Sequence, residues 1–305
     1  MTNPSADAPA LVILAAGMAR RYGGCKPLAP IGPHGGAVLD LLVSDAVRAG
    51  FGRIVLVLHP ETGPAIRYHV RRCWPAEVPI DFAVQRVPLG TTHATLAARD
   101  LVDPSAPFAI ANADDVYGSA AMGSLVTQLT GTPEEHALVG FEVRNTVVSD
   151  DPVTRGVCEV DARGFLRSLD ERKQVARTDG GERFTVGDGR QPTSVPGDSL
   201  VSVNLWGFQP GMWDELAKAM AESGLDEETA LGAGPLAGGH PEVLLPVVVG
   251  DMVADGRGLP VRVLATDARC IGVTHPDDLP VARAELARQV AWGTRDDRPW
   301  RSLRP

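Results

Sequence analysis

The chain has 305 residues, of which 44% are hydrophobic, and it contains 33 glycines and 25 prolines. This length and composition suffice for one large α/β domain or two small ones with a real core, and they exclude a disordered chain. The net charge of −9 and the isoelectric point near 5.3 argue against a general binder of nucleic acid or of anionic membranes, because such binders need a positive field.

The sequence carries no recognisable targeting or zinc-binding pattern. No run approaches the roughly 18 apolar residues of a membrane span, and the first ten residues lack the charged region and apolar core of a signal peptide. Four cysteines lie far apart with no CxxC pair, which favours free thiols over disulfides or a zinc site. We therefore expect a cytoplasmic protein without nucleic-acid or membrane partners. The sequence leaves its oligomeric state open, a homo-oligomer included.

The first half of the chain alternates apolar strands with helical patterns. Residues 11–16 form a continuous apolar run that ends at Gly17, which is typical of a strand buried on both faces of a parallel sheet. A loop rich in glycine and proline (17–36) follows. Helices are then expected near 38–49, 64–73 and 91–101, and strands near 53–59, 80–85 and 108–112. This order predicts a doubly wound, mainly parallel sheet flanked by helices.

The pattern changes beyond residue 135, where turns and not helices link the strands. Strands are expected near 137–143, 157–160, 165–169 and 199–208. They imply an added antiparallel section. The polar segment 174–198 is long for a compact loop, so we expect it to be flexible or to form a lid. Helices near 211–222, 242–253 and 277–292 and strands near 261–265 and 270–273 complete the prediction.

The stretch from Leu14 to Leu28 (LAAGMARRYGGCKPL) carries the clearest chemical signal. Its glycines let backbone N–H groups approach an anion, while Arg20, Arg21 and Lys26 can neutralise a triphosphate. The loop is not a Walker loop, because GK[ST] is absent, and it is not a GxGxxG dinucleotide fingerprint. The alternative is a basic surface loop with ordinary turn glycines, which the position directly after a buried strand disfavours.

This stretch resembles the L-A-x-G-x-G-x-R…K-P-L signature of the sugar-phosphate nucleotidyltransferases, the pyrophosphorylase-type enzymes of the GT-A-like nucleotide-binding fold. The resemblance implies that Arg21 and Lys26 act on the triphosphate and on the transition-state charge. Ala19 stands where the second glycine is usual, and we expect the loop to tolerate it. The other nucleotide-binding positions implied in the loop are Leu14, Ala15, Ala16, Gly17, Met18 and Arg20.

A second block, QRVPLGT, follows in the family's order. Gln85, Gly90 and Thr91 resemble the base-binding segment, in which the glutamine amide pairs with the nucleobase and the backbone at the glycine approaches it closely. An amide can both donate and accept, as base recognition requires. Taken alone, a strand-end glutamine and a helix-opening Gly-Thr would be the simpler interpretation. Gln85 permits uracil or thymine and does not exclude adenine or guanine.

A third block, ANADDVYG (111–118), ends a buried strand in two carboxylates and resembles the family's metal-binding segment. Asp114 takes the metal-binding position, and Mg²⁺ is the implied cofactor, since this ion uses one or two carboxylates plus substrate phosphates. Asp115 is either a solvated turn carboxylate or a supporting group. The aspartate that often completes the metal site falls on Gly272. The candidates for its replacement are a water, Asp251, Asp267 and Asp277.

Two later stretches, R-G-V at 155–157 and D-E-R-K at 170–173, resemble those that hold the sugar phosphate. The resemblance places Gly156 near the sugar, Glu171 on a hydroxyl and Arg172 at the family's lysine. Lys173 could serve instead of Arg172, because only one of two neighbours in a strand can face the pocket. Asn204 could bind the acceptor or could be a buried structural residue.

The sequence thus predicts an enzyme, a Mg²⁺-dependent nucleotidyltransferase of the GT-A-like α/β fold. A phosphate oxygen of a sugar 1-phosphate or a cyclitol phosphate would attack the α-phosphorus of an NTP and expel pyrophosphate. One domain is expected over 11–293, with a nucleotide-binding half (11–135) and an acceptor-binding half (136–293), a flexible N-terminus (1–10) and a polar tail (294–305). The alternatives are a metal-dependent glycosyltransferase of the same fold and a non-catalytic regulator that binds nucleotide or sugar phosphate.

Overall fold

The computed structural model describes residues 8–17, 24–147, 151–178, 182–234, 239–273 and 277–300. Its strands are β1 (Ala10–Ala15), β2 (Arg53–Leu58), β3 (Ile80–Val84), β4 (Phe108–Asn112), β5 (Asp115–Val116), β6 (His136–Glu142), β7 (Val153–Val160), β8 (Leu166–Arg177), β9 (Arg183–Val186), β10 (Ser194–Pro196), β11 (Leu200–Ser202), β12 (Trp206–Phe208), β13 (Val261–Thr266) and β14 (Ile271–Gly272). Its α-helices are α1 (Val38–Ala49), α2 (Gly63–Cys73), α3 (Thr91–Leu96), α4 (Ser119–Gly131), α5 (Met212–Ser223), α6 (Glu227–Ala233), α7 (Leu245–Ala254) and α8 (Asp278–Ala291).

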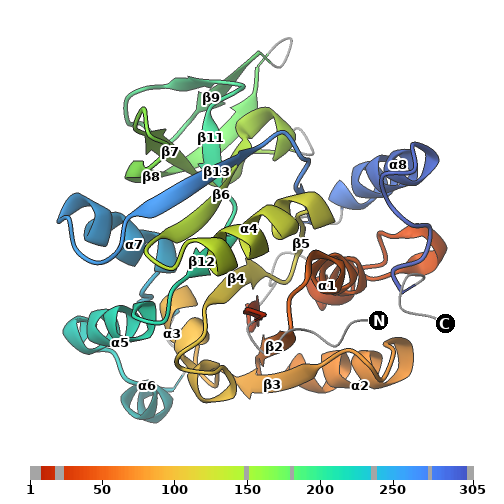
Figure 1. Ribbon diagram of the computed structural model, residues 1–305, viewed down its shortest axis with the longest axis horizontal. Helices are drawn as coiled ribbons and strands as arrows, with labels where there is room; N and C mark the ends of the chain where they lie inside the picture. The colour runs from red at the N-terminus through yellow and green to blue at the C-terminus, as the bar shows by residue number, and fades with distance from the viewer. Residues whose placement is uncertain are drawn as a thin grey trace.

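One mixed sheet runs through the molecule in the order β10-β9-β8-β7-β11-β6-β12-β4-β1-β2-β3, and β13 pairs with β6 (Figure 1). The pairs β3–β2, β2–β1 and β1–β4 are parallel. The strands from β10 to β7 pair antiparallel, and so does β11 with both of its neighbours. The expected fold class, a mainly parallel α/β sheet with an added antiparallel section, is therefore confirmed.

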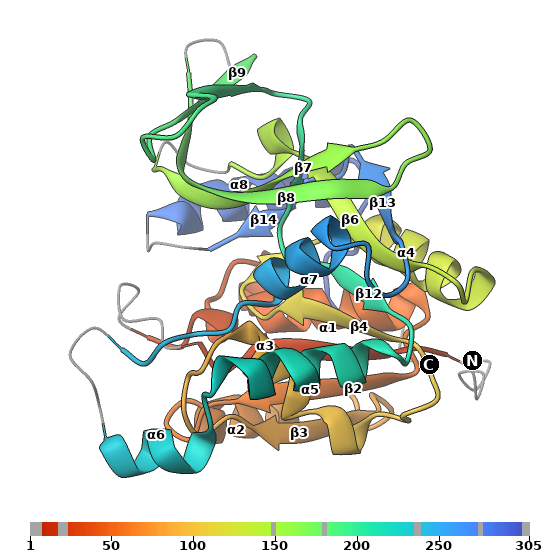
Figure 2. The same ribbon diagram turned by 90° about the vertical axis from the view of Figure 1, so that its left-hand side faces the viewer.

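Helices cover both faces of the parallel strands, as the apolar run of β1 requires. Successive side chains of a strand point to opposite faces, and β1 is apolar on both. Leu11 and Ile13 pack with residues of α1, α2 and α4 in one core cluster. Ala10 and Val12 pack with residues of α3, α5 and α7 in a second cluster. Figure 2 looks onto this second face, where α3, α5 and α7 lie in front of the strands.

The segment expected to be a flexible loop or lid, 174–198, is instead an extension of the sheet. Strand β8 continues to Arg177 and pairs with β9, which pairs with β10. Val175, Phe184 and Val195 are buried together in a small core of their own. The apolar residues of this segment stand singly among polar ones, so the sequence pattern did not indicate strands here. Figure 2 shows β8 and β9 above the parallel part of the sheet.

Two helices and the division of one expected strand into two were not predicted. The short helix α6 escaped notice, and α4 hides its apolar face because small residues such as Ala121 stand beside Met122, Leu125 and Leu129 on the buried side. The stretch expected as one strand, 199–208, divides into β11 and β12 around Asn204, which has a left-handed φ of 61°.

The two expected chain ends are partly packed. The N–H of Gly52 donates to the carbonyl of Pro9, and β1 begins one residue later, while residues 1–7 lie outside the described part. In the expected polar tail, Arg295 Nη2 lies 2.7 Å from Oδ2 of the buried Asp45. The ring centroid of Trp300, a residue 6% exposed, lies 5.3 Å from that of Trp74. The packed part of the tail therefore extends at least to residue 300.

None of the helices that the structure describes is both long and apolar enough to span a bilayer.

Candidate functional site

The candidate site begins where β1 and β4 end side by side. Leu14 is the parallel partner of Asn112, and the N–H of Ala113 donates to the Leu14 carbonyl at 3.2 Å. Ala15 and Ala16 are buried at this edge, and Gly17 is exposed just beyond it. Polar groups that follow parallel strands collect at the carboxyl edge of the sheet, which is where α/β folds bind ligands. The expected contributors Met18, Ala19, Arg20 and Arg21 lie outside the described residues.

Lys26 and Asp114 meet at this edge. Lys26 opens a short 3₁₀ helix (Lys26–Leu28) at the end of the nucleotide loop (14–28), and Asp114 follows β4. The Lys26 Nζ lies 3.6 Å from Asp114 Oδ2, and the side chains are 16% and 37% exposed. Two residues that the sequence analysis assigned to the triphosphate and to the metal are therefore neighbours, and both remain accessible to a ligand.

Asp115 turns into the protein beside Asp114. Its Oδ2 accepts a hydrogen bond from Asn112 Nδ2 at 3.1 Å and lies 3.4 Å from the Tyr117 hydroxyl. Burial, followed by the negative charge of Asp114, raises the pKa of Asp115 to about 7, although the positive charge of Arg155 acts in the opposite direction. A divalent cation between these two carboxylates would relieve their repulsion, and hard oxygen ligands suit Mg²⁺. The donor set therefore fits the implied cofactor.

Gly272 lies directly opposite Asp115 in the antiparallel pair of β14 and β5. A Cβ atom at Gly272 would lie 2.5 Å from Asp115 Oδ1, so the two positions compete for one space and the Asp115 carboxylate fills it. Asp114 joins no cluster of three or more His, Cys, Asp or Glu side chains within the described ranges, so none of the three expected replacements completes one there. Asp115 is the carboxylate that stands in the place the sequence assigned to residue 272.

Gln85 follows β3 and is 4% exposed. Its side-chain nitrogen, Nε2, donates to the carbonyl of Gly90 at 3.1 Å and also lies 3.1 Å from Nδ1 of His93. The two members of the expected base-binding pair are therefore joined directly, and His93, which sequence analysis did not select, is the third member. A histidine on the first turn of a helix gave no signal of this contact.

Gly90 and Thr91 hold the polypeptide segment before α7. Gly90 has a φ of +100°, and a Cβ there would lie 2.4 Å from the carbonyl oxygen of Val243. The Thr91 hydroxyl accepts a hydrogen bond from the N–H of Leu245 at 2.8 Å. Glycine is therefore required at position 90 by the protein's own backbone, whereas the sequence analysis attributed the close approach to the base.

A cavity of about 100 Å³ lies beside Asp115 and brings together the expected acceptor residues Gly156, Glu171 and Asn204. Its full lining is Asn112, Asp115, Thr154, Arg155, Gly156, Glu171, Ser202, Val203, Asn204 and Pro246. A neighbouring hollow of about 370 Å³ shares Glu171 and Pro246 with it, so a ligand larger than the cavity has room to extend along β8 and α7.

Strand register explains how these acceptor residues meet. Gly156 of β7 is the antiparallel partner of Glu171 of β8, and a Cβ at Gly156 would lie 3.0 Å from a methyl group of Leu169. Asn204 sits at the break between β11 and β12, and its Oδ1 accepts a hydrogen bond from Trp206 Nε1 at 3.2 Å. The Asn204 amide is thus both fixed by a buried tryptophan and part of the cavity wall.

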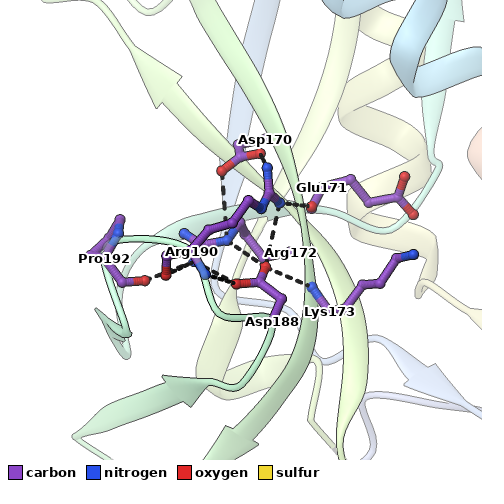
Figure 3. A network of polar contacts seen from close by, with 7 residues as sticks. All are labelled: Asp170, Glu171, Arg172, Lys173, Asp188, Arg190 and Pro192. Carbon is purple, nitrogen blue, oxygen red and sulfur yellow. Dashed lines mark hydrogen bonds and ion pairs between the residues drawn. The ribbon is translucent and has the colours of Figure 1, made fainter.

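Arg172 does not face this cavity, which corrects the expectation from sequence. Its guanidinium binds Asp188 through Nε at 2.8 Å and also donates to the carbonyls of Arg190 and Pro192. The residue is 1% exposed. Figure 3 shows Glu171 and Lys173 on one side of β8 and Arg172 directed to the other, toward Asp188. The alternation of strand side chains leaves Lys173 as the cation on the side of Glu171.

Asn112 and Arg155 are among the lining residues that received no role from the sequence. Asn112 orients Asp115, and its position as the polar last residue of a buried strand was a usable signal. Arg155 donates through Nε to the Thr146 hydroxyl at 2.9 Å and borders the cavity. It stood in the recognised R-G-V stretch, but only Gly156 was taken from that stretch.

The chain resembles known proteins in sequence and in fold. Residues 11–225 match the family described as the MobA-like NTP transferase domain. The chain is 31% identical over 165 residues to the bifunctional protein GlmU of Paraburkholderia phymatum, covering 54% of this chain and 34% of that protein. The GlmU of Paraburkholderia phytofirmans is 32% identical over 165 residues, with the same shares. The chain therefore spans about a third of the length of these curated relatives.

Among solved structures, HddC from Yersinia pseudotuberculosis complexed with GMP-PN superposes with a TM-score of 0.59 at 19% identity, covering 91% of this chain and 99% of that one. A second HddC structure from the same organism gives a TM-score of 0.57 at 17% identity with the same coverage. At these identities the likeness shows a shared fold.

Proposed function

Because the chain belongs to the MobA-like NTP transferase domain family, we propose that it transfers a nucleotidyl group from an NTP to a sugar 1-phosphate or a cyclitol phosphate and releases pyrophosphate. The observation that carries this proposal is the meeting of Lys26 and Asp114 at the carboxyl edge of the sheet. Lys26 belongs to the stretch that follows β1 in the chain, and Asp115, the neighbour of Asp114, lines the acceptor cavity.

On the nucleotide side, Lys26 neutralises the phosphate oxygens on which charge develops as pyrophosphate leaves. Arg21, outside the described residues, is proposed to do the same. Asp114 and Asp115 would hold Mg²⁺, which supplies charge neutralisation and a fixed orientation for the phosphates. Asn112 keeps the Asp115 carboxylate in place through its 3.1 Å hydrogen bond.

On the acceptor side, Glu171 accepts hydrogen bonds from hydroxyl groups of the ring, and Asn204 binds the ring edge at the opposite wall. Lys173 lies on the same side of β8 as Glu171 and orients the anionic phosphate (Figure 3). Gly156 contributes its backbone to the cavity wall beside Glu171, because Leu169 and Ser202 already fill the space that a side chain at position 156 would need. Arg172 is assigned a structural role, because its guanidinium is bonded to Asp188 and to backbone carbonyls.

The reaction needs no general base, because a phosphate oxygen is already ionised at neutral pH. The side chains therefore contribute by positioning the two substrates and by neutralising charge. The HddC structure complexed with GMP-PN supports a nucleotide-handling site on this fold. The choice of a sugar or cyclitol phosphate, the cytoplasmic location and the use of Mg²⁺ are parts of this proposal.

A screen for pyrophosphate release tests the proposal. The purified protein is incubated with Mg²⁺, each common NTP and a panel of sugar and cyclitol phosphates. We expect pyrophosphate to appear only with a matching pair of substrates. Binding of nucleotide without pyrophosphate from any pair would indicate a regulator, and consumption of a nucleotide-sugar donor would indicate a glycosyltransferase. Either result would contradict the proposal.

A further inference from the structure

Gln85 is the polar side chain from which the base preference of the site can be derived. It stands at the carboxyl end of β3, where its N–H donates to the carbonyl of Leu58 at 2.9 Å. This backbone bond and the low exposure of 4% fix the root of the side chain. The orientation of its terminal amide is therefore decided by the groups around it.

Both hydrogens of the Gln85 side-chain nitrogen are engaged inside the protein. The carbonyl oxygen of Gly90, at 3.1 Å, can only accept, so the nitrogen and not the oxygen of the amide must face it. Nδ1 of His93 lies at 3.1 Å from the same nitrogen and accepts the second hydrogen when the imidazole is neutral and carries its proton on Nε2. A reversed amide would place its oxygen against the Gly90 carbonyl oxygen.

The Gly90 carbonyl has little freedom to turn away from Gln85. Its oxygen also accepts the N–H of Ala94 at 3.1 Å, as the first turn of α3 requires. The backbone around it is pinned from the other side, since Val243 donates to the carbonyl of Leu89 at 2.9 Å and accepts from Thr92 at 3.0 Å. The amide of Gln85 is therefore locked with its nitrogen inward.

The side-chain oxygen of Gln85, Oε1, is left as the recognition group. Among the described residues, no group donates a hydrogen bond to Oε1. Oε1 is also not one of the side-chain polar atoms that are both fully buried and without a hydrogen-bond partner in that part of the chain. A ligand placed against this residue meets a hydrogen-bond acceptor with two lone pairs and no free donor.

The base-pairing edges of the common nucleobases differ in the hydrogen-bond donors that they offer to such an acceptor. Guanine offers two adjacent donors, the ring N1–H and the exocyclic N2–H, which can both reach one acceptor, while its own acceptor O6 lies on the far side of N1–H. Uracil and thymine offer one ring N–H between two carbonyl oxygens. Adenine and cytosine offer one amine beside a ring nitrogen that is itself an acceptor, and the locked amide has no hydrogen for that nitrogen. A site that offers hydrogen bonds to particular groups discriminates against analogues that leave those bonds unmade.

We propose that Gln85, locked by Gly90 and His93, selects guanine, so that the nucleotide donor is GTP. This inference rests on the proposed function, because it takes Gln85 as the residue that contacts the base.

Binding of five nucleotides to the full-length protein tests this inference, with isothermal titration calorimetry in the presence of Mg²⁺. GTP is expected to bind about tenfold or more tightly than ATP and CTP, because each of these offers Oε1 one donor and the ring acceptor beside that donor repels it. Inosine triphosphate keeps N1–H but lacks the N2 amine, so it should bind about fivefold more weakly than GTP, and UTP should bind about as inosine triphosphate does.

Two matched glutamine variants show whether Gln85 causes the preference. Gln85→Met removes the acceptor and should reduce the difference between GTP and ATP to within about twofold. Gln209→Met is the control, because Gln209 is also buried, 5% exposed, and also donates through Nε2 to two carbonyls, those of Leu129 and Thr132. The control should keep the wild-type preference, and thermal unfolding of both variants checks that they fold.

The outcomes separate this inference from the proposed function. If ATP, CTP or UTP binds as tightly as GTP, or if Gln85→Met keeps the preference, the base assignment is wrong while nucleotidyl transfer still stands. If no nucleotide binds, both fail. The predicted order, with its loss in Gln85→Met alone, supports the assignment.

Discussion

The two sides of the site hold their side chains in different ways. On the nucleotide side, Lys26 and Asp114 follow buried parallel strands, and loops direct both toward the same edge of the sheet. On the acceptor side, Glu171, Arg172 and Lys173 are consecutive residues of β8, and only every second one reaches the cavity side. The position of a residue along the chain is therefore enough to place it after the end of a strand. Inside a strand, the register decides which face of the sheet its side chain reaches.

The largest effect should come from the nucleotide side. Lys26→Ala or Asp114→Ala is expected to reduce turnover by a factor of about 10² or more, because each removes charge or metal binding on which the transition state depends. Pyrophosphate release measures this effect. Lys218→Ala, which removes an exposed partner of Glu222, is the matched control and should keep full turnover. Unchanged turnover in the Lys26 and Asp114 variants would refute the assigned roles.

The pair of Asp115 and Gly272 provides the next test, at the boundary between the two sides. Asp115→Gly should weaken binding of Mn²⁺, a paramagnetic substitute for Mg²⁺, by about tenfold or more. The double variant Asp115→Gly with Gly272→Asp moves the carboxylate across the strand pair into the same space and should restore most of that binding. Electron paramagnetic resonance counts the free ion. Wild-type affinity in Asp115→Gly would remove Asp115 from the metal site.

On the acceptor side, variants of the two neighbouring residues Lys173 and Arg172 should affect different properties, the first the KM for the acceptor and the second the stability. Lys173→Met should raise the KM for the acceptor phosphate about tenfold and leave the thermal unfolding midpoint unchanged, since Lys173 is exposed. Arg172→Met should lower the unfolding midpoint, because it removes the buried guanidinium that binds Asp188 at 2.8 Å and donates to two backbone carbonyls. A stable Arg172→Met variant with a raised KM would show that the two residues have been assigned the wrong way round.

The smallest effect is a pH dependence of stability on the acceptor side. The hydrogen bond from Arg172 holds the pKa of Asp188 well below its ordinary value of 3.8. A depressed carboxyl pKa contributes stability that is complete above the unfolded value and is lost as the pH falls through the folded one. The difference in urea midpoint between wild type and Asp188→Asn should stay constant from about pH 7 to about pH 5 and shrink below about pH 4. A constant difference down to the lowest pH would argue against the ion pair.

The same contrast explains what could be predicted from the sequence. The parallel strands were predictable because their apolar runs are continuous, and Asp114 lies two residues after such a strand while Lys26 stands in the glycine-rich stretch that follows another. The Arg172 assignment failed because the sequence pattern fixed neither the register of β8 nor its partner Asp188, 16 residues further along the chain. Nothing local to Asp115 or Gly272 shows that they face each other, and nothing in the first turn of α3 shows that His93 orients Gln85.

Nucleotidyl transfer requires that the acceptor attack the α-phosphorus of the NTP and not the γ-phosphorus. The direct measurement is the fate of radioactive label from NTP carrying it in either the α- or the γ-phosphate, incubated with enzyme, Mg²⁺ and an accepted sugar or cyclitol phosphate. We expect the α-label to enter the acceptor product and the γ-label to leave as pyrophosphate in equal amount. Transfer of the γ-label to the acceptor, or release of labelled inorganic phosphate without product, would contradict it.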